Sequence, residues 1–187
     1  MNTRHFMELL KAQYANGHFV CVGLDSDLAK IPECVRRGDV EETIFAFNRR
    51  IVEATFDFVC AYKPNSAFYE GQGDEGWRAL KRTVDYIHKG MPAIPVILDA
   101  KRGDIGNTNN GYVQMAFDYL DVDAITVPPY LGGKSLQPFL DRPDKGIIVL
   151  CRTSNEESDE FQGRLTKVDD SEAVFLRGHY PQTYPIG

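Results

Sequence analysis

Residues 99–108 read Asp99-Ala100-Lys101-Arg102-Gly103-Asp104-Ile105-Gly106-Asn107-Thr108, and they follow an apolar run from Ile94 to Leu98. The apolar run predicts a buried strand. Because side chains two apart on a strand point to the same face, we expect Asp99 and Lys101 to lie together at its end. Burying charges is costly unless they are paired, so charges are seldom placed there for stability. This stretch is the first candidate for a functional site.

A helix is predicted to begin after Gly103, where the backbone must turn. Asp104 stands at its expected start, and Thr108, four residues on, shares a face with it. Taken by spacing alone, Asp104 is equally well explained as a helix N-cap. Asp99 and Lys101 could likewise form a purely structural ion pair.

Apolar runs and helical periodicity alternate along the chain. Strands are predicted at 18–24, 58–62, 94–98, 124–127 and 146–150, and helices at 3–15, from 39 (with Asp39 as its cap) through 51, 74–90 (with Asp74 as its cap), 105–119 and 135–140. This alternation predicts right-handed βαβ units and a parallel sheet. Polar candidates fall at or just past the carboxyl ends of the strands. Both a (β/α)8 barrel and a doubly wound sheet bind ligands at that edge, so the pattern leaves the two folds open.

Composition bounds the class of protein. A chain of 187 residues suits one domain with a real core. The formal net charge of -6 argues against a general role in binding nucleic acid or a membrane surface. The sequence has no apolar signal core and no stretch long enough to span a bilayer, so we expect a cytoplasmic protein.

The four cysteines show no Cys-x-x-Cys spacing. Cys21, Cys60 and Cys151 lie in apolar, strand-like runs. They are therefore predicted to be buried free thiols in a reducing compartment. The four histidines have no metal-ligand spacing, so no histidine metal site is expected.

Four further segments add to residues 99–108. They read Val-Gly-Leu-Asp-Ser-Asp (22–27), Ala-Tyr-Lys-Pro-Asn (61–65), Thr-Val-Pro-Pro-Tyr-Leu-Gly-Gly (126–133) and Cys-Arg-Thr-Ser-Asn (151–155). With Asp99-x-Lys101-x-x-Asp104, they closely resemble the orotidine 5′-phosphate decarboxylase family, in the form typical of its longer bacterial subfamily. The resemblance implies a homodimer on a (β/α)8 barrel. It also implies cofactor-free conversion of orotidine 5′-phosphate to uridine monophosphate (UMP) in de novo pyrimidine biosynthesis.

The resemblance also implies roles for single residues. Lys101 would protonate a carbanion at C6 of the pyrimidine, and Asp99, Asp104 and Lys63 would complete a charge network around it. Asp104, Ile105 and Thr108 would serve the neighbouring subunit's site.

Lys63 would pair with Asp99 and contact the ribose, and Asp25 would bind the ribose hydroxyls. Either Thr153 or Ser154 would contact the pyrimidine. Without the resemblance, Lys63 is a cation that ends a strand, Asp25 is a turn residue, and Thr153 and Ser154 are polar loop residues.

The resemblance runs from about residue 6 to about residue 165. It predicts a partial barrel at 1–165 with about five βα units, a divergent tail at 166–187, and no closing units. Two alternatives therefore stand beside the decarboxylase. One is an inactive truncated remnant. The other is a related sugar-phosphate decarboxylase or aldolase, in which Asp25, Asp99 and Asp104 would hold Mg²⁺.

Overall fold

The structure is a computed structural model that describes residues 4–163, 165–167 and 173–175. It divides into two compact units, residues 1–149 and residues 150–187. No helix among the described residues is both long enough and apolar enough to cross a bilayer.

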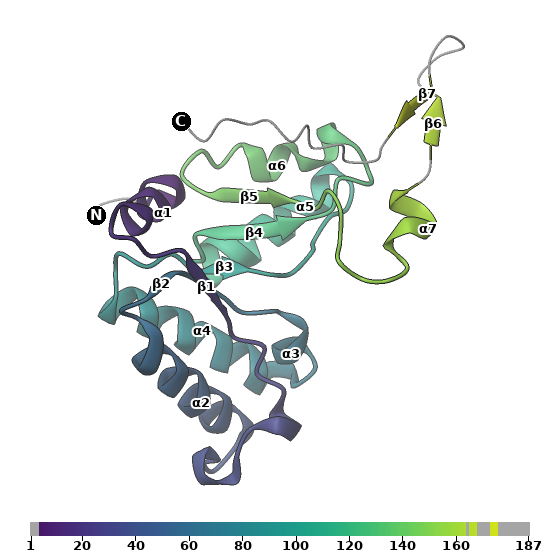
Figure 1. The fold of residues 1–187 in the computed structure, drawn as a ribbon. Helices are drawn as coiled ribbons and strands as arrows, with labels where there is room; N and C mark the ends of the chain where they lie inside the picture. The colour runs from purple at the N-terminus through teal and green to yellow at the C-terminus, as the bar shows by residue number, and fades with distance from the viewer. Residues whose placement is uncertain (1–3, 164, 168–172, 176–187) are drawn as a thin grey trace. The chain divides into compact units, whose positions relative to one another are not determined.

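Five parallel strands of the first unit form a two-stranded and a three-stranded sheet that isolated bridges connect. The strands are β1 (Val20–Gly23), β2 (Val59–Lys63), β3 (Ile97–Leu98), β4 (Ala124–Val127) and β5 (Gly146–Val149). β1 pairs with β2, β2 reaches the β3 segment through bridges at Tyr62 and Asn65, and β3, β4 and β5 pair in turn. The strands thus lie side by side in chain order (Figure 1). A doubly wound sheet would reverse its order at a switch point, so this arc is the start of a barrel.

The arc is open among the residues described. β1 pairs only with β2, and β5 only with β4. β1 is accordingly not the buried strand that its apolar sequence predicts, since Val20 is 55 % exposed. The burial predicted for two cysteines is wrong for the same reason: Cys21, on β1, and Cys151, just past β5, are exposed. Only Cys60, on the inner strand β2, is buried, and all four thiols are free.

Helices join the strands of this unit. They are α1 (Phe6–Ala15), α2 (Val40–Thr55), α3 (Ala67–Glu70), α4 (Gly73–Gly90), α5 (Gly106–Val113), which continues as a wider helical turn through Tyr119, and α6 (Gln137–Leu140). The predicted cap of α2 is confirmed, because the Asp39 carboxylate accepts the Glu42 N–H at 2.8 Å. The predicted cap of α4 is wrong: Gln72 precedes the helix, and Asp74 lies in its first turn.

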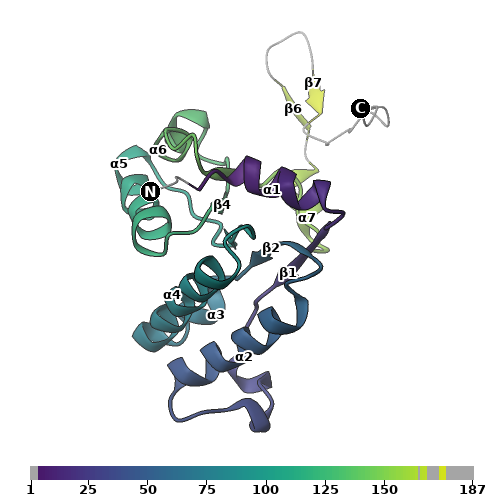
Figure 2. The same ribbon diagram turned by 90° about the vertical axis from the view of Figure 1, so that its left-hand side faces the viewer.

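The apolar core has two parts. The larger lies between the strands and the helices that cover them, and includes Ile44, Leu80, Leu98 and Ile125. The smaller joins Phe6 of α1 to Cys60, Ala61, Ile97 and Ala124 of the strands. The Phe6 N–H donates to the Asp144 carbonyl at 2.9 Å, just before β5. α1 therefore lies at the amino ends of the strands (Figure 2).

Gly146 makes the approach of α1 possible, and this can be tested. A Cβ at this position would come within 2.3 Å of the Phe6 ring and 2.7 Å of the Ala124 Cβ. We expect Gly146→Ala to lower the free energy of unfolding by about 1–3 kcal/mol through overpacking. The matched control is Gly111→Ala in α5, whose Cβ would meet nothing within 4 Å. Helix propensity makes that change neutral or stabilising by up to about 1 kcal/mol. Equal urea midpoints for the two variants would contradict this packing.

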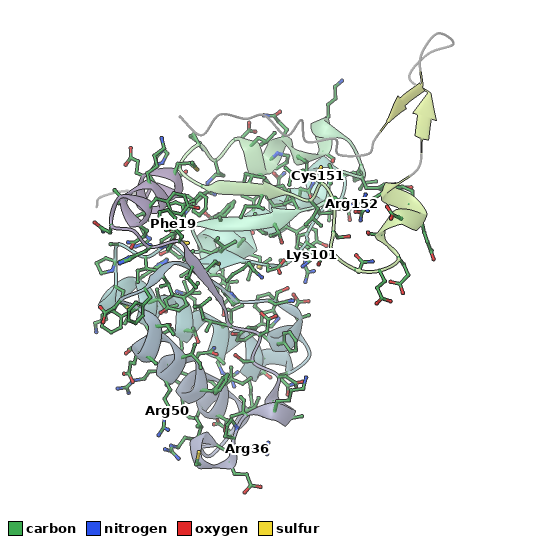
Figure 3. All side chains as sticks on the ribbon, viewed as in Figure 1. Phe19, Arg36, Arg50, Lys101, Cys151 and Arg152 are labelled. Atoms are coloured by element: carbon green, nitrogen blue, oxygen red, sulfur yellow. The ribbon has the colours of Figure 1, made fainter. Side chains whose placement is uncertain are left out.

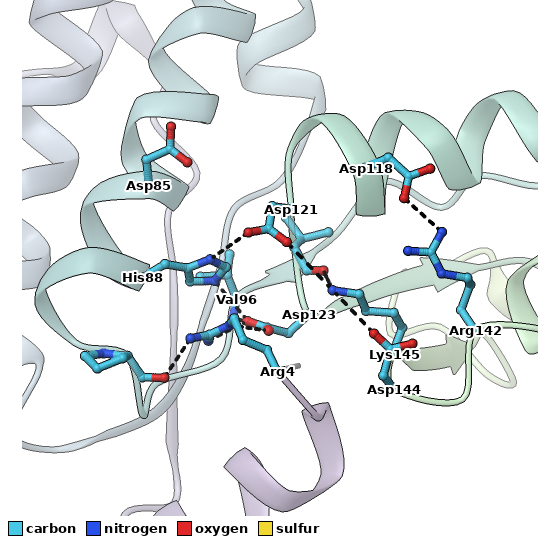
Figure 4. Close-up of polar contacts among 12 residues, drawn as sticks. Arg4, Asp85, His88, Val96, Asp118, Asp121, Asp123, Arg142, Asp144 and Lys145 are labelled. Atoms are coloured by element: carbon cyan, nitrogen blue, oxygen red, sulfur yellow. Dashed lines mark hydrogen bonds and ion pairs between the residues drawn. The ribbon is translucent and has the colours of Figure 1, made fainter. Parts of the chain in front are cut away.

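A buried carboxylate fastens the chain's start to the same end of the strands (Figure 4). Asp123, fully buried before β4, accepts the Arg4 guanidinium at 2.8 and 3.0 Å, His88 Nε2 at 3.1 Å and the Val96 N–H at 2.8 Å. Arg4 also donates to the Pro92 and Ile94 carbonyls. Burial alone would raise the Asp123 pKa, but His88 and Arg4 outweigh it and hold that pKa at about 2.

The second unit contains α7 (Ser158–Gln162) and an antiparallel pair, β6 (Leu165–Lys167) and β7 (Ala173–Phe175), with Thr166 opposite Val174. The sequence patterns do not predict this pair. Most of the predicted tail, residues 166–187, lies outside the described residues, so the boundary after Leu165 stays a prediction.

Candidate active site

The candidate site centres on Asp99, at the carboxyl end of β3. Its two oxygens accept hydrogen bonds from different lysines. The Lys63 ammonium donates to Oδ2 at 2.8 Å, and the Lys101 ammonium donates to Oδ1 at 2.7 Å. Asp99 is 9 % exposed as a whole residue, whereas the Lys101 side chain is 49 % exposed. Figure 3 shows Lys101 at the end of the strands opposite Phe19, which precedes β1. The prediction that the side chains of Asp99, Lys101 and Lys63 lie together is confirmed.

Local electrostatics keep this cluster charged. Burial alone would raise the Asp99 pKa, but hydrogen bonds from Lys101, Lys63 and Thr126 hold it at about 2. Burial likewise opposes the Lys63 charge, yet Asp99 and, more distantly, Asp25 outweigh it and hold the Lys63 pKa above its ordinary value. The site therefore holds an ionised Asp99 between the side chains of Lys63 and Lys101.

The sequence interpretation missed one member of this cluster, Thr126. This residue is the last but one of β4, and its hydroxyl donates to Asp99 Oδ1 at 2.9 Å while accepting the Lys101 N–H at 2.9 Å. The pairing of Leu98 with Ile125 places Thr126 beside Asp99. A polar residue at the carboxyl end of an otherwise apolar strand was the signal that could have identified it.

The segment after Lys101 bends sharply. Lys101 has φ +48°, in the left-handed region that residues with a Cβ seldom adopt. A Cβ at Gly103 would lie 3.0 Å from the Pro128 ring, so glycine allows the segment to pass close to the loop after β4.

Asp104 does not have the helix-capping contact that its spacing allows. α5 begins at Gly106, so Asp104 precedes the helix and does not cap it. Its carboxylate instead accepts the Ile105 N–H at 2.6 Å. Ile105 is 65 % exposed, and Thr108 is also exposed.

Asn109, a second residue that sequence interpretation missed, holds this turn. Its fully buried amide accepts the Asp104 N–H at 2.9 Å and donates to the Asp104 and Ser135 carbonyls, each at 2.6 Å. This amide fixes the main chain of Asp104 on both sides. Nothing in the local sequence distinguishes it, since residues 107–110 are all polar.

Asp25 follows β1 and is exposed. With Ile31, Phe47 and Phe68 it lines a pocket of about 210 Å³. The carbonyl of Leu24, the residue before Asp25, accepts the Tyr69 hydroxyl at 2.8 Å. A buried polar network supports this loop: Ser26 and Asn48 are hydrogen-bonded, and the Asn48 amide donates to Tyr69 and Thr83, each at 3.0 Å.

Thr153 and Ser154 belong to the second unit. There the Thr153 N–H donates to Gln162 Oε1 at 2.8 Å, and its hydroxyl donates to Asn155 at 2.6 Å. Ser154 is exposed. Their contact with a pyrimidine stays a prediction. Asp25, Asp99 and Asp104 do not gather into a cluster that could hold a metal ion, and no other such group occurs within the described part of the chain.

Known proteins resemble this chain in sequence and in fold. The model of the orotidine 5′-phosphate decarboxylase / HUMPS family matches residues 19–180. A curated relative from Herpetosiphon aurantiacus, named orotidine 5′-phosphate decarboxylase, is 51 % identical over 173 residues, which cover 92 % of this chain and 62 % of the relative.

Solved structures agree. A crystal structure from Toxoplasma gondii superposes with a TM-score of 0.84 at 38 % identity, covering 94 % of this chain and 57 % of that one. Leishmania donovani OMP decarboxylase superposes with a TM-score of 0.76 at 40 % identity, covering 92 % and 61 %. The chain spans about three fifths of the length of the curated relatives it matches. It belongs to the orotidine 5′-phosphate decarboxylase / HUMPS family.

Proposed function

We propose that this chain carries the catalytic charge network of an orotidine 5′-phosphate decarboxylase, which converts orotidine 5′-phosphate to UMP without a cofactor. One observation carries the proposal. A carboxylate whose pKa is about 2 lies between two ammonium groups at the carboxyl ends of β2 and β3. Active sites of barrel enzymes lie at that face.

The chemistry needs a cation beside the reacting carbon. When the bond between C6 and the substrate carboxylate breaks, carbon dioxide leaves and the electron pair stays on C6. The Lys101 ammonium stabilises that charge and transfers a proton to form the C6–H bond; the neutral amine then regains a proton from water. At about 4 Å and an effective dielectric of about 20, one such charge pairing is worth about 4 kcal/mol.

Asp99 has two roles in this proposal. It aims Lys101, through the 2.7 Å hydrogen bond from the ammonium. It would also face the substrate carboxylate, so that repulsion between the like charges is relieved as carbon dioxide leaves. Lys63 and Asp25 would bind the ribose, and Thr153 or Ser154 the pyrimidine ring.

The main alternative is a metal-dependent sugar-phosphate decarboxylase or aldolase. A direct test uses the chain joined after Leu165 to the C-terminal portion of the Herpetosiphon aurantiacus relative, termed here the extended chain. We expect it to form UMP from orotidine 5′-phosphate at the same rate with and without a chelator. Loss of turnover on chelation, or turnover of a sugar phosphate alone, would favour the alternative.

We further propose a homodimer in which Asp104, Ile105 and Thr108 serve the neighbouring subunit's site. The exposure of Ile105 and Thr108 supports this role.

Mixing two inactive extended chains tests the shared site. Lys101→Ala and Asp104→Ala subunits are expected to regain activity together, up to about a quarter of the parent value at random exchange, because a hybrid dimer rebuilds one intact site. The control is each variant mixed with itself. If subunit exchange is demonstrated by mass and the mixture stays inactive, the shared-site proposal is wrong.

A further inference from the structure

We propose that Thr126 is a positioning residue for this site, because its hydroxyl ties the Asp99 carboxylate to the main chain of Lys101. The effect of Thr126 on catalysis rests on the proposed function. The hydrogen bonds of Thr126 do not depend on that function.

The hydroxyl of Thr126 both donates and accepts a hydrogen bond. It has one proton, which it donates to Asp99 Oδ1 at 2.9 Å, and a lone pair, which accepts the Lys101 N–H at 2.9 Å. The Lys101 ammonium donates to the same Oδ1 at 2.7 Å. Lys101 is thus held at both ends, by its main chain through Thr126 and by its ammonium through Asp99.

The main chain of Lys101 needs such a hold. Its φ of +48° is an unfavourable conformation for a residue with a Cβ, and it persists only where surrounding contacts impose it. Thr126 supplies two of them, since its carbonyl also accepts the Arg102 N–H at 3.2 Å. The residue is 6 % exposed, so no bulk water replaces a lost hydroxyl.

The role differs from that of the charged neighbours. Asp99 is faced by Lys63 from β2 and by Lys101 from its own segment, and Asp25 and Cys21 act on Lys63. Those groups set the charge of the cluster. Thr126 is neutral, and its contribution is the direction in which Lys101 leaves the strand.

Three variants separate positioning from general destabilisation. Thr126→Val keeps the branched shape but removes the hydroxyl, Thr126→Ser keeps the hydroxyl, and Ile125→Val is a matched change at the neighbouring buried position of β4. In the chain as it stands, amide hydrogen exchange at Lys101 reports the hold directly. We expect at least about tenfold faster exchange in Thr126→Val, with Thr126→Ser and Ile125→Val close to the parent.

Turnover in the extended chain gives the second readout. Thr126→Val should lower kcat by at least about tenfold with a smaller change in KM, and Thr126→Ser should restore most of it. An unchanged Lys101 exchange rate in Thr126→Val would overturn the inference, and so would a loss in Thr126→Ser or Ile125→Val as large as that in Thr126→Val. An extended parent without turnover would instead refute the proposed function, and the exchange rates would still decide whether Thr126 holds Lys101.

Discussion

Lys101→Ala in the extended chain is expected to abolish UMP formation while leaving the circular dichroism spectrum close to that of the parent. The variant removes the cation beside C6 and the proposed proton donor in one step. Loss of one charge pairing worth about 4 kcal/mol alone corresponds to nearly a thousandfold in rate. The fold should survive, since the Lys101 side chain is about half exposed and lies outside both apolar clusters.

The matched control is Lys89→Ala, which removes an exposed lysine from the last turn of α4. Its turnover should stay within about twofold of the parent, as expected for a surface substitution away from the site. Retention of more than about a tenth of the parent rate by Lys101→Ala would exclude Lys101 as the proton donor.

Asp123→Ala is expected to have the largest effect on stability. The substitution leaves the Arg4 guanidinium, His88 and the Val96 N–H without their shared acceptor. Breaking a buried ion pair in this way typically costs about 3–5 kcal/mol. Urea unfolding measures the loss. Asp118→Ala is the control, because Asp118 meets Arg142 at the surface, with its side chain 53 % exposed, where a pair is worth about 0–1 kcal/mol.

The advantage of the parent over Asp123→Ala should also depend on pH. The folded-state pKa of Asp123 is about 2, below its ordinary 3.8, so the ionised form favours the folded chain. That contribution is fully present above about pH 5 and is lost as pH falls through 4 toward 2. At about 1.4 kcal/mol per pKa unit, roughly 2 kcal/mol of the difference should disappear. A difference that stays constant from pH 6 to pH 3 would contradict the role of an ionised Asp123.

The order of strands and helices could be predicted because it depends on local patterns. The cap at Asp39 and the periodic face of α2 lie within a few residues of each other. The burial of β1 could not be predicted in this way, since Val20 and Cys21 have apolar sequence neighbours but few spatial ones. Burial on an outer strand depends on what pairs with it, which no local window contains.

The residues of the candidate site also differ in whether local sequence could predict them. Asp99, Lys101 and Lys63 could be found because charged residues at strand ends conflict with burial. Thr126 and Asn109 are neutral, and their partners come from another strand or from the far side of a turn. The spacing left a helix cap open as one explanation of Asp104, but α5 begins at Gly106, one residue later than such a cap requires.

Turnover of orotidine 5′-phosphate, followed as the loss of its absorbance, tests the central proposal most directly. It should be measured for the extended chain and for residues 1–187 alone. We expect the extended chain to decarboxylate the substrate. Turnover by the shorter chain should be slow. The family resemblance implies that segments after the fifth βα unit bind the substrate's phosphate, and binding of such a remote group positions the reacting centre. A folded extended chain without turnover would contradict the proposal that Asp99, Lys101 and Lys63 form the decarboxylase site.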